Sequence, residues 1–286
     1  MPFLTAADGT PIAFDDCVVA QPQAAVVLVH GYAEHRGRYR YVVERLNEAG
    51  ISCYLFDLRG HGESGGRRGH VDRFELYLDD LSMIVTRAGG STAAPLFLFG
   101  HSLGGLIALS YVRAHAAGLR AVAVSSPFLH PQFAVSPFDK MLTIVGSRLA
   151  PSLSVASGLD PNGISRDPNV VAAYVDDPLV FSNTTPRWFD EVSRAQRELA
   201  AHAAEITLPA LFLVGGADPI ASSAFTTTFF ATLGSADKTF RPYEGLLHEV
   251  LNEPERDLVI HDLQAWIAAR ASQPEAASSL PAGRPH

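Results

Sequence analysis

Short apolar runs alternate along the chain with stretches in which apolar residues return every three or four positions. The runs predict buried strands at Ala24–Val29, Ile51–Phe56, Leu96–Phe99, Leu119–Ser125, Ala210–Val214 and Lys238–Tyr243. The periodic stretches predict helices at Tyr39–Ala49, Phe74–Ala88, Gly105–Ala117 and Glu255–Arg270. Nearly continuous apolar strands that alternate with helices are typical of an α/β fold, with a mostly parallel sheet covered on both faces. Before them, Phe3–Ala6 and Pro11–Ala20 predict a hairpin around Asp8-Gly9.

One long segment interrupts this alternation. Residues 127–208 are rich in Pro, Ser and Asp and contain short amphipathic pieces such as Pro137–Leu149. A segment of this length needs structure of its own or a function, so we interpret it as an inserted helical cap. Residues 1–126 and 209–270 then form one core, and residues 271–286 are expected to be a disordered tail.

Composition removes several classes of partner. The net charge of -8 offers no electrostatic footprint for nucleic acid or an anionic membrane. The first eight residues lack the basic and apolar parts of a signal peptide, and no apolar run reaches the length of a membrane span. We therefore expect a cytoplasmic, soluble protein, with Cys17 and Cys53 as buried free thiols rather than a disulfide. The oligomeric state stays open.

The segment Gly100-His-Ser-Leu-Gly104 has the form G-x-S-x-G between a predicted strand and a predicted helix. This arrangement predicts a nucleophile elbow, a sharp turn whose central serine has a strained backbone. The flanking residues must be glycine because a Cβ atom would collide with the neighbouring strand and helix. Ser102 is thus the candidate nucleophile, beside a helix N-terminus that favours negative charge.

A serine hydroxyl needs a base, and the base needs an acid to orient it. Asp218 follows the strand Ala210–Val214, and His248 follows the strand Lys238–Tyr243. Their order after Ser102 is the serine, acid, histidine order of this fold class. Asp57 also ends a strand, but it precedes the serine and is a distant second candidate for the acid.

The other histidines have structural interpretations. His101 is held by the elbow turn, and His61 lies in a glycine-rich turn. His115 and His261 fall on predicted helices, and His30 is expected to support its loop from behind the site.

Acyl transfer also requires donors for the oxyanion. The backbone N–H of Leu103, directly after the serine, is one candidate. Tyr32, in the loop after the strand Ala24–Val29, is the other, again through its backbone N–H. No metal-binding or dinucleotide-binding motif is present in the sequence, so we expect neither a metal nor a cofactor.

The chain resembles the monoacylglycerol lipase and lysophospholipase branch of the α/β hydrolases over about residues 10–270. The similarity lies in His30–Tyr39, Phe56–Ser64, Gly100–Gly105, Ser165–Leu179, Gly215–Asp218 and Tyr243–Glu253. The run H-G-x-x-E-H-x-x-R-Y is the most specific of these. The resemblance implies a serine hydrolase of single-chain glycerol esters with Ser102, Asp218 and His248 as its triad. It also implies Tyr32 and Leu103 as oxyanion donors and a cap that sets acyl-chain selectivity.

The substrate hypothesis is a monoacylglycerol, and it depends on the apolar positions of the cap. These are Phe138, Met141, Leu142, Ile144, Val145 and Leu149. They could line an acyl tunnel or touch a lipid surface, and the first five are candidate substrate-binding residues. Packing on the domain below is an equally good interpretation of each residue taken singly. Three other functions compete: a lysophospholipase, a carboxylesterase for small esters, and a non-catalytic acyl binder. The intact triad disfavours the binder, and the serine at the elbow disfavours dehalogenation.

Overall fold

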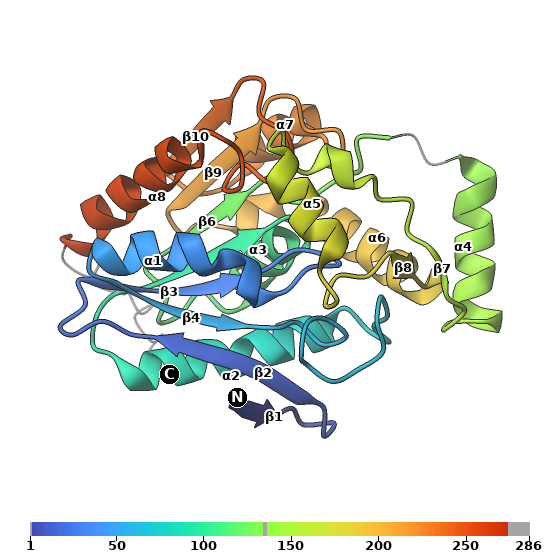
Figure 1. The fold of residues 1–286 in the computed structure, drawn as a ribbon, viewed down its shortest axis with the longest axis horizontal. Coiled ribbons are helices and arrows are strands. Elements are labelled where there is room, and N and C mark those ends of the chain that lie inside the picture. Colours follow the sequence, from blue (N-terminus) through green and yellow to red (C-terminus); the bar gives the residue numbers. More distant parts are fainter. Residues whose placement is uncertain (1, 134–135, 274–286) are drawn as a thin grey trace, which may run out of the picture.

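A twisted eight-stranded sheet forms the centre of the computed structural model, which describes residues 2–133 and 136–273 (Figure 1). The strands follow the order β1-β2-β4-β3-β5-β6-β9-β10. Their bounds are β1 Phe3–Thr5, β2 Pro11–Cys17, β3 Ala24–Val29, β4 Ile51–Phe56, β5 Leu96–His101, β6 Ala121–Ser125, β9 Ala210–Gly215 and β10 Lys238–Tyr243. From β4 to β10 all neighbours run parallel, while β1 and β2 are antiparallel. The predicted mostly parallel sheet is confirmed.

Helices cover both faces of this sheet. One face packs against α2, α3, α6 and α7, and the other packs against α1 and α8. Their bounds are α1 Arg40–Glu48, α2 Glu75–Ser91, α3 Leu103–Ala114, α6 Pro186–Ala201, α7 Ser223–Thr232 and α8 Arg256–Ala271. Every residue of β3, β4 and β5 is buried, as expected for strands between two helical layers.

The segment between β6 and β9, which we call the inserted segment, leaves the sheet and returns to it. It contains α4 Pro137–Leu149, β7 Val155–Ala156, a 3-10 turn Pro161–Gly163, α5 Pro168–Asp176, β8 Asn183–Thr184 and α6. Its last helix belongs to the main apolar core, because Trp188, Val192 and Leu199 pack there. In contrast, α4 stands at the edge of the molecule and packs against α6 (Figure 1).

Several element ends differ from their predictions. The helix after the nucleophile begins at Leu103 and ends at Ala114, so His115 lies just beyond it. A 3-10 turn, Arg36–Tyr39, precedes α1, and α2 continues to Ser91. Helix α7 was not predicted; its N-terminus is capped by the Ser222 hydroxyl, which accepts from the Phe225 N–H at 3.3 Å. Its apolar residues are interleaved with threonines, which blurs the helical period.

Three further predictions concern the chain as a whole. Among the described residues, no helix is long and apolar enough to span a bilayer. Cys17 and Cys53 are free thiols, although they lie directly opposite each other on β2 and β4. Cys53 is buried as predicted, but Cys17 is only half-buried. The predicted tail begins at the last residue of α8, and its part from residue 274 lies outside the described residues.

Candidate active site

Ser102 occupies the sharp turn between β5 and α3. Its φ of 50° and ψ of -116° are a strained conformation for a residue with a side chain. A Cβ atom on Gly100 would lie 2.2 Å from the Gly104 carbonyl oxygen, and one on Gly104 would lie 2.2 Å from the Val29 carbonyl oxygen. Both glycines are therefore required by close backbone approach, as the elbow motif predicts.

The structure brings the three predicted triad residues together. The Ser102 Oγ lies 2.8 Å from His248 Nε2, and His248 Nδ1 lies 2.7 Å from Asp218 Oδ2. All three side chains are buried. The second oxygen of Asp218 accepts from the N–H groups of Ile220 at 2.8 Å and Ala221 at 3.0 Å, so the carboxylate is held in one orientation.

Asp57, the alternative acid, has different partners. It is fully buried and ion-paired with Arg36. Its oxygens also accept from the backbone N–H groups of Arg36 and Glu63, both at 2.8 Å. These bonds stabilise the loop after β4 and leave Asp218 as the partner of His248.

The electrostatic surroundings of His248 favour its protonated form. Burial acts to lower the pKa of His248, but the Asp218 carboxylate, with help from Glu249 and Glu34, raises it above the ordinary value. The ring of His101 lies 4.9 Å from that of His248. Burial lowers the pKa of His101 to about 4, so this neighbour is neutral at pH 7. A proton taken from Ser102 is thus stabilised on His248.

The two predicted oxyanion donors lie beside the nucleophile. In the described part of the chain, the backbone N–H groups of Tyr32 and Leu103 have no hydrogen-bond acceptor, so both are free to donate. His30 holds the Tyr32 loop, because its Nε2 accepts from the Leu58 N–H at 2.9 Å and its Nδ1 lies 2.7 Å from the Gly31 carbonyl. The Tyr32 side chain has a use that the sequence did not reveal: its hydroxyl donates to the Asn183 carbonyl of the inserted segment at 2.6 Å.

A buried charge network that the sequence did not reveal connects two loops: residues 30–35 after β3, which we call the oxyanion loop, and residues 244–253 after β10, which we call the histidine loop. Glu34 accepts from the Gly31 N–H at 2.5 Å and from Arg38 at 2.9 Å. Arg38 also donates to both oxygens of Glu249, each at 2.7 Å. Burial acts to raise the pKa of Glu249, but the charge of Arg38 holds it below its ordinary value. Glu249 directly follows His248, and that adjacency was the available signal.

A second missed arrangement ties His248 to the inserted segment. The N–H groups of His248 and Glu249 donate to the carbonyls of Gly163 and Ile164, at 3.4 and 2.8 Å. Fully buried Glu253 accepts from the Leu247 N–H at 2.6 Å on one side. On the other side it accepts from the N–H and Nε of Arg166, both at 3.1 Å. Residues 163–166 of the inserted segment are thereby hydrogen-bonded to the loop that carries His248.

The remaining histidines lie away from this hydrogen-bond chain. His61 is buried, with its Nδ1 3.0 Å from the Arg59 carbonyl, and burial lowers its pKa to about 3. His115 and His261 are exposed, the first just after α3 and the second within α8. No group of three or more His, Cys, Asp or Glu side chains in the described ranges is arranged to hold a metal ion.

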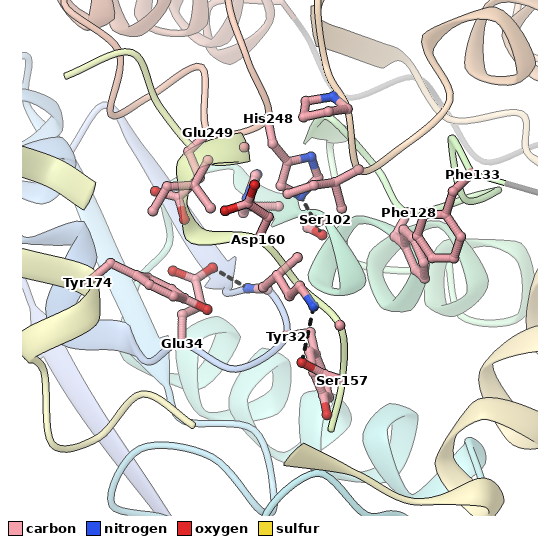
Figure 2. A pocket seen from close by; sticks show the side chains of 18 of the residues that line it. Tyr32, Glu34, Ser102, Phe128, Phe133, Ser157, Asp160, Tyr174, His248 and Glu249 are labelled. Carbon is pink, nitrogen blue, oxygen red and sulfur yellow. Dashed lines mark hydrogen bonds between the residues drawn. The ribbon is translucent and has the colours of Figure 1, made fainter. Parts of the chain in front are cut away.

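A pocket opens above Ser102, between the sheet and the inserted segment. Figure 2 shows Phe128 and Phe133 on one side of Ser102, and Glu34 and Tyr174 on the other. Its lining residues are Gly31, Tyr32, Glu34, His101, Ser102, Phe128, Phe133, Ser157, Gly158, Leu159, Asp160, Gly163, Ile164, Tyr174, Trp188, Pro219, Ile220, His248 and Glu249. The pocket therefore has an aromatic side and an acidic side.

The five cap residues predicted to bind substrate lie elsewhere. Phe138, Met141, Leu142, Ile144 and Val145 are exposed on α4, with exposed fractions between 44 and 65%. None of them is among the described residues that line the pocket over Ser102. Their contact with an acyl chain stays a prediction.

Comparison with known proteins agrees with this geometry. The family model described as serine aminopeptidase, S33, matches residues 20–255. A monoacylglycerol lipase from Mycolicibacterium smegmatis is 36% identical over 253 residues, which cover 87% of this chain and 89% of that protein. Phospholipase YtpA from Bacillus subtilis is 31% identical, with 86% and 95% covered. The crystal structure of a monoacylglycerol lipase from Paleococcus ferrophilus superposes with a TM-score of 0.84 at 33% identity, covering 91% of this chain and 99% of that one.

Proposed function

This chain belongs to the serine aminopeptidase S33 family, in the monoacylglycerol lipase branch of the α/β hydrolases, and from that premise we propose that it hydrolyses monoacylglycerols to fatty acid and glycerol. The observation that carries the proposal is the hydroxyl of Ser102, hydrogen-bonded to His248 beneath a pocket with an aromatic side and an acidic side. The family description names a peptidase, but the similar proteins that cover most of the chain include a monoacylglycerol lipase and a phospholipase. Both of those names describe enzymes that cleave lipid esters.

In the first half of the reaction, Ser102 Oγ attacks the ester carbonyl carbon while His248 Nε2 takes the hydroxyl proton. Asp218 keeps the other imidazole nitrogen in place and stabilises the imidazolium. The N–H groups of Tyr32 and Leu103 stabilise the oxyanion. The tetrahedral intermediate then collapses, the C–O bond to the alcohol breaks, and His248 gives its proton to the departing glycerol oxygen.

In the second half, water attacks the acyl-enzyme at the same carbonyl carbon. His248 accepts the proton of that water and returns it to Ser102 Oγ as the bond between serine and acyl group breaks. The products are a free fatty acid and the regenerated enzyme.

The two sides of the pocket match the two ends of a monoacylglycerol, the acyl chain and the glycerol. The aromatic side, with Phe128 and Phe133, offers apolar contact for an acyl chain (Figure 2). The opposite side presents Glu34, whose carboxylate can accept hydrogen bonds from glycerol hydroxyls, and Tyr174, whose hydroxyl can donate or accept them. This polarity favours an ester with one apolar and one hydroxylated end.

We also propose that the inserted segment acts as the cap of this pocket, and that the exposed apolar face of α4 makes transient contact with lipid surfaces that supply the substrate. The face carries Phe138, Met141, Leu142, Ile144, Val145 and Leu149, all at least 44% exposed. An apolar surface of this kind is favourable against acyl chains and unfavourable in water. The cytoplasmic location stays a prediction.

The test compares initial rates on monoacylglycerols and matched p-nitrophenyl esters over a range of acyl lengths. We expect medium- or long-chain monoacylglycerols to be preferred, and Ser102→Ala to lose a factor of about 10⁴ or more in kcat. Activity that survives in Ser102→Ala would show that the nucleophile is another residue.

Two other ester hydrolases are compatible with the same triad. A preference for two to four carbons with poor glyceride turnover would identify a carboxylesterase of small esters. Preference for lysophospholipids would identify a phospholipase, which the similarity to the Bacillus subtilis protein makes the stronger alternative. A non-catalytic acyl binder is tested separately, because labelling of Ser102 by a fluorophosphonate would contradict it.

A further inference from the structure

Asp160 places a carboxylate in the wall of the pocket over Ser102. Its Oδ1 accepts from the N–H and the Nδ2 of Asn162, both at 2.9 Å. Among the ion pairs of the described residues, none involves Asp160, and the residue is exposed. In the view of Figure 2 it projects between Ser102 and Tyr174, on the acidic side of the pocket.

The other two acids of the pocket differ from Asp160 because both share a cation. Glu34 and Glu249 are ion-paired with Arg38, which neutralises part of their charge. The described lining of the pocket contains no lysine and no arginine. An anion in the pocket would therefore meet three carboxylates and no lysine or arginine side chain of the described lining.

The dimensions of the pocket make this charge effective. The cavity encloses about 200 Å³, so a headgroup held within it lies within about 10 Å of Asp160. At this distance, near the protein surface, two like charges repel by an amount that corresponds to about a tenfold change in rate or affinity. A phosphate also needs cationic or N–H partners for its desolvated oxygens. No lysine or arginine side chain of the described lining supplies such a partner.

We propose that Asp160 is a specificity-determining residue that discriminates against esters with an anionic headgroup. The inference rests on the proposed ester hydrolase function and deepens it. Neutral monoacylglycerols and anionic lysophospholipids contain the same scissile ester, so headgroup charge is the property that Asp160 distinguishes. The direction is unambiguous: neutral glycerol esters are accepted and glycerol phosphate esters are disfavoured.

The chain contains a matched control for this residue. Asp160-Pro-Asn162 is repeated seven residues later as Asp167-Pro-Asn169. Asp167 makes the same bonds, to the N–H of Asn169 at 2.9 Å and to its Nδ2 at 3.1 Å, but it does not line the pocket. Asparagine retains the accepting oxygen in both turns, so Asp→Asn removes the charge and keeps the turn.

The experiment measures kcat/KM of the full chain, Asp160→Asn and Asp167→Asn on two substrates, 1-octanoylglycerol and 1-octanoylglycerol 3-phosphate, at concentrations where both are monomeric. We expect the unsubstituted protein to prefer the neutral ester. Asp160→Asn should improve the ratio of phosphate to neutral ester by about tenfold at low salt, and by less at high salt because ions screen the repulsion. Asp167→Asn should leave the ratio unchanged.

Three results would overturn the inference: equal turnover of both esters by the unsubstituted protein, an unchanged ratio in Asp160→Asn, or an equal change in Asp167→Asn. Failure of the proposed function has a different signature, namely no hydrolysis of 1-octanoylglycerol by the unsubstituted protein. In that case the charge effect is measured with 4-nitrophenyl butyrate and the anionic 4-butyryloxybenzenesulfonate. The same change of ratio in Asp160→Asn would then support the role of Asp160, and its absence would overturn it.

Discussion

Two parts of the inserted segment differ sharply in how they are held. The anchored part, residues 160–185, is hydrogen-bonded to both loops that carry the chemistry. Its Gly163 and Ile164 carbonyls accept from the histidine loop, and Asp177 pairs with His35 of the oxyanion loop at 2.8 Å. In contrast, α4 packs against α6 and exposes a row of large apolar side chains to solvent.

The physical state of the two parts follows from their partners. The anchored part satisfies buried backbone groups and charges, so moving it would leave polar groups unpaired at a cost of roughly 1–3 kcal/mol each. The large apolar side chains described on α4 are 44–81% exposed, so burying each of them would gain roughly half or more of the about 1.5–3 kcal/mol that a fully exposed side chain gains. The anchored part thus behaves as a wall of the active site, and α4 as a surface that can gain a partner.

The strongest test of this difference is at Glu253, which links the histidine loop to the anchored part. In a glutamine side chain at position 253, the amide NH₂ group would face either the Leu247 N–H or the Arg166 donors. Two donors would then oppose each other, so the histidine loop would shift. Because a displacement of about 1 Å can cost about 100-fold, we expect Glu253→Gln to lower kcat by about that factor with little change in KM. Steady-state kinetics with fluorophosphonate titration of the active fraction measures this.

Glu255→Gln is the matched control for this test, because Glu255 also pairs with Arg166 but makes no bond to the histidine loop. Its kcat should stay near that of the unsubstituted protein. An equal loss in both variants, or a loss explained by a smaller active fraction, would show that Glu253 only maintains the fold.

A smaller effect is expected at Glu249, on the other side of His248. Its negative charge raises the pKa of His248, and the neutral imidazole is the form that accepts the serine proton. Glu249→Gln should therefore lower the pKa of His248 and move the acidic limb of the kcat/KM profile to lower pH. We also expect kcat to fall by about tenfold, because Arg38 would remain buried with one ion-pair partner fewer. A limb that stays in place, measured with a p-nitrophenyl ester between pH 5 and 9, would contradict the electrostatic role.

The smallest effect should come from α4. Leu142, which is 58% exposed, should contribute to lipid contact and not to folding. Leu142→Gln is expected to weaken binding to phosphatidylcholine vesicles by about fivefold while Tm and turnover of a short soluble ester stay unchanged. Leu258→Gln on α8, where the leucine is 56% exposed, is the control and should bind vesicles normally. A lower Tm in Leu142→Gln alone would mean that this face packs within the protein.

The elbow and the order of the triad could be predicted because each depends on local signals. Gly100, Ser102 and Gly104 are specified within five residues, and Asp218 and His248 each follow a readable strand. The inserted segment was harder, since α5 is short and the pieces between its helices are rich in proline and polar residues. Its last helix, α6, does have a helical period, with Trp188, Val192 and Leu199 buried on one face, but that period does not say which distant elements the face packs against.

The sequence by itself determined the parallel sheet, the strained serine and the three residues that meet at it. These follow from hydrophobic period, glycine geometry and the convergence of strand ends at one edge of a sheet. Only the tertiary structure decided that Arg38 joins Glu34 to Glu249, that Glu253 fastens the histidine loop, and that Asp160 faces the pocket while Asp167 does not. Asp160 and Asp167 begin the same sequence, Asp-Pro-Asn, and accept the same pair of hydrogen bonds, so this motif alone could not separate them. Only Asp160 lines the pocket, because long-range packing decides where each Asp-Pro-Asn segment lies in the fold.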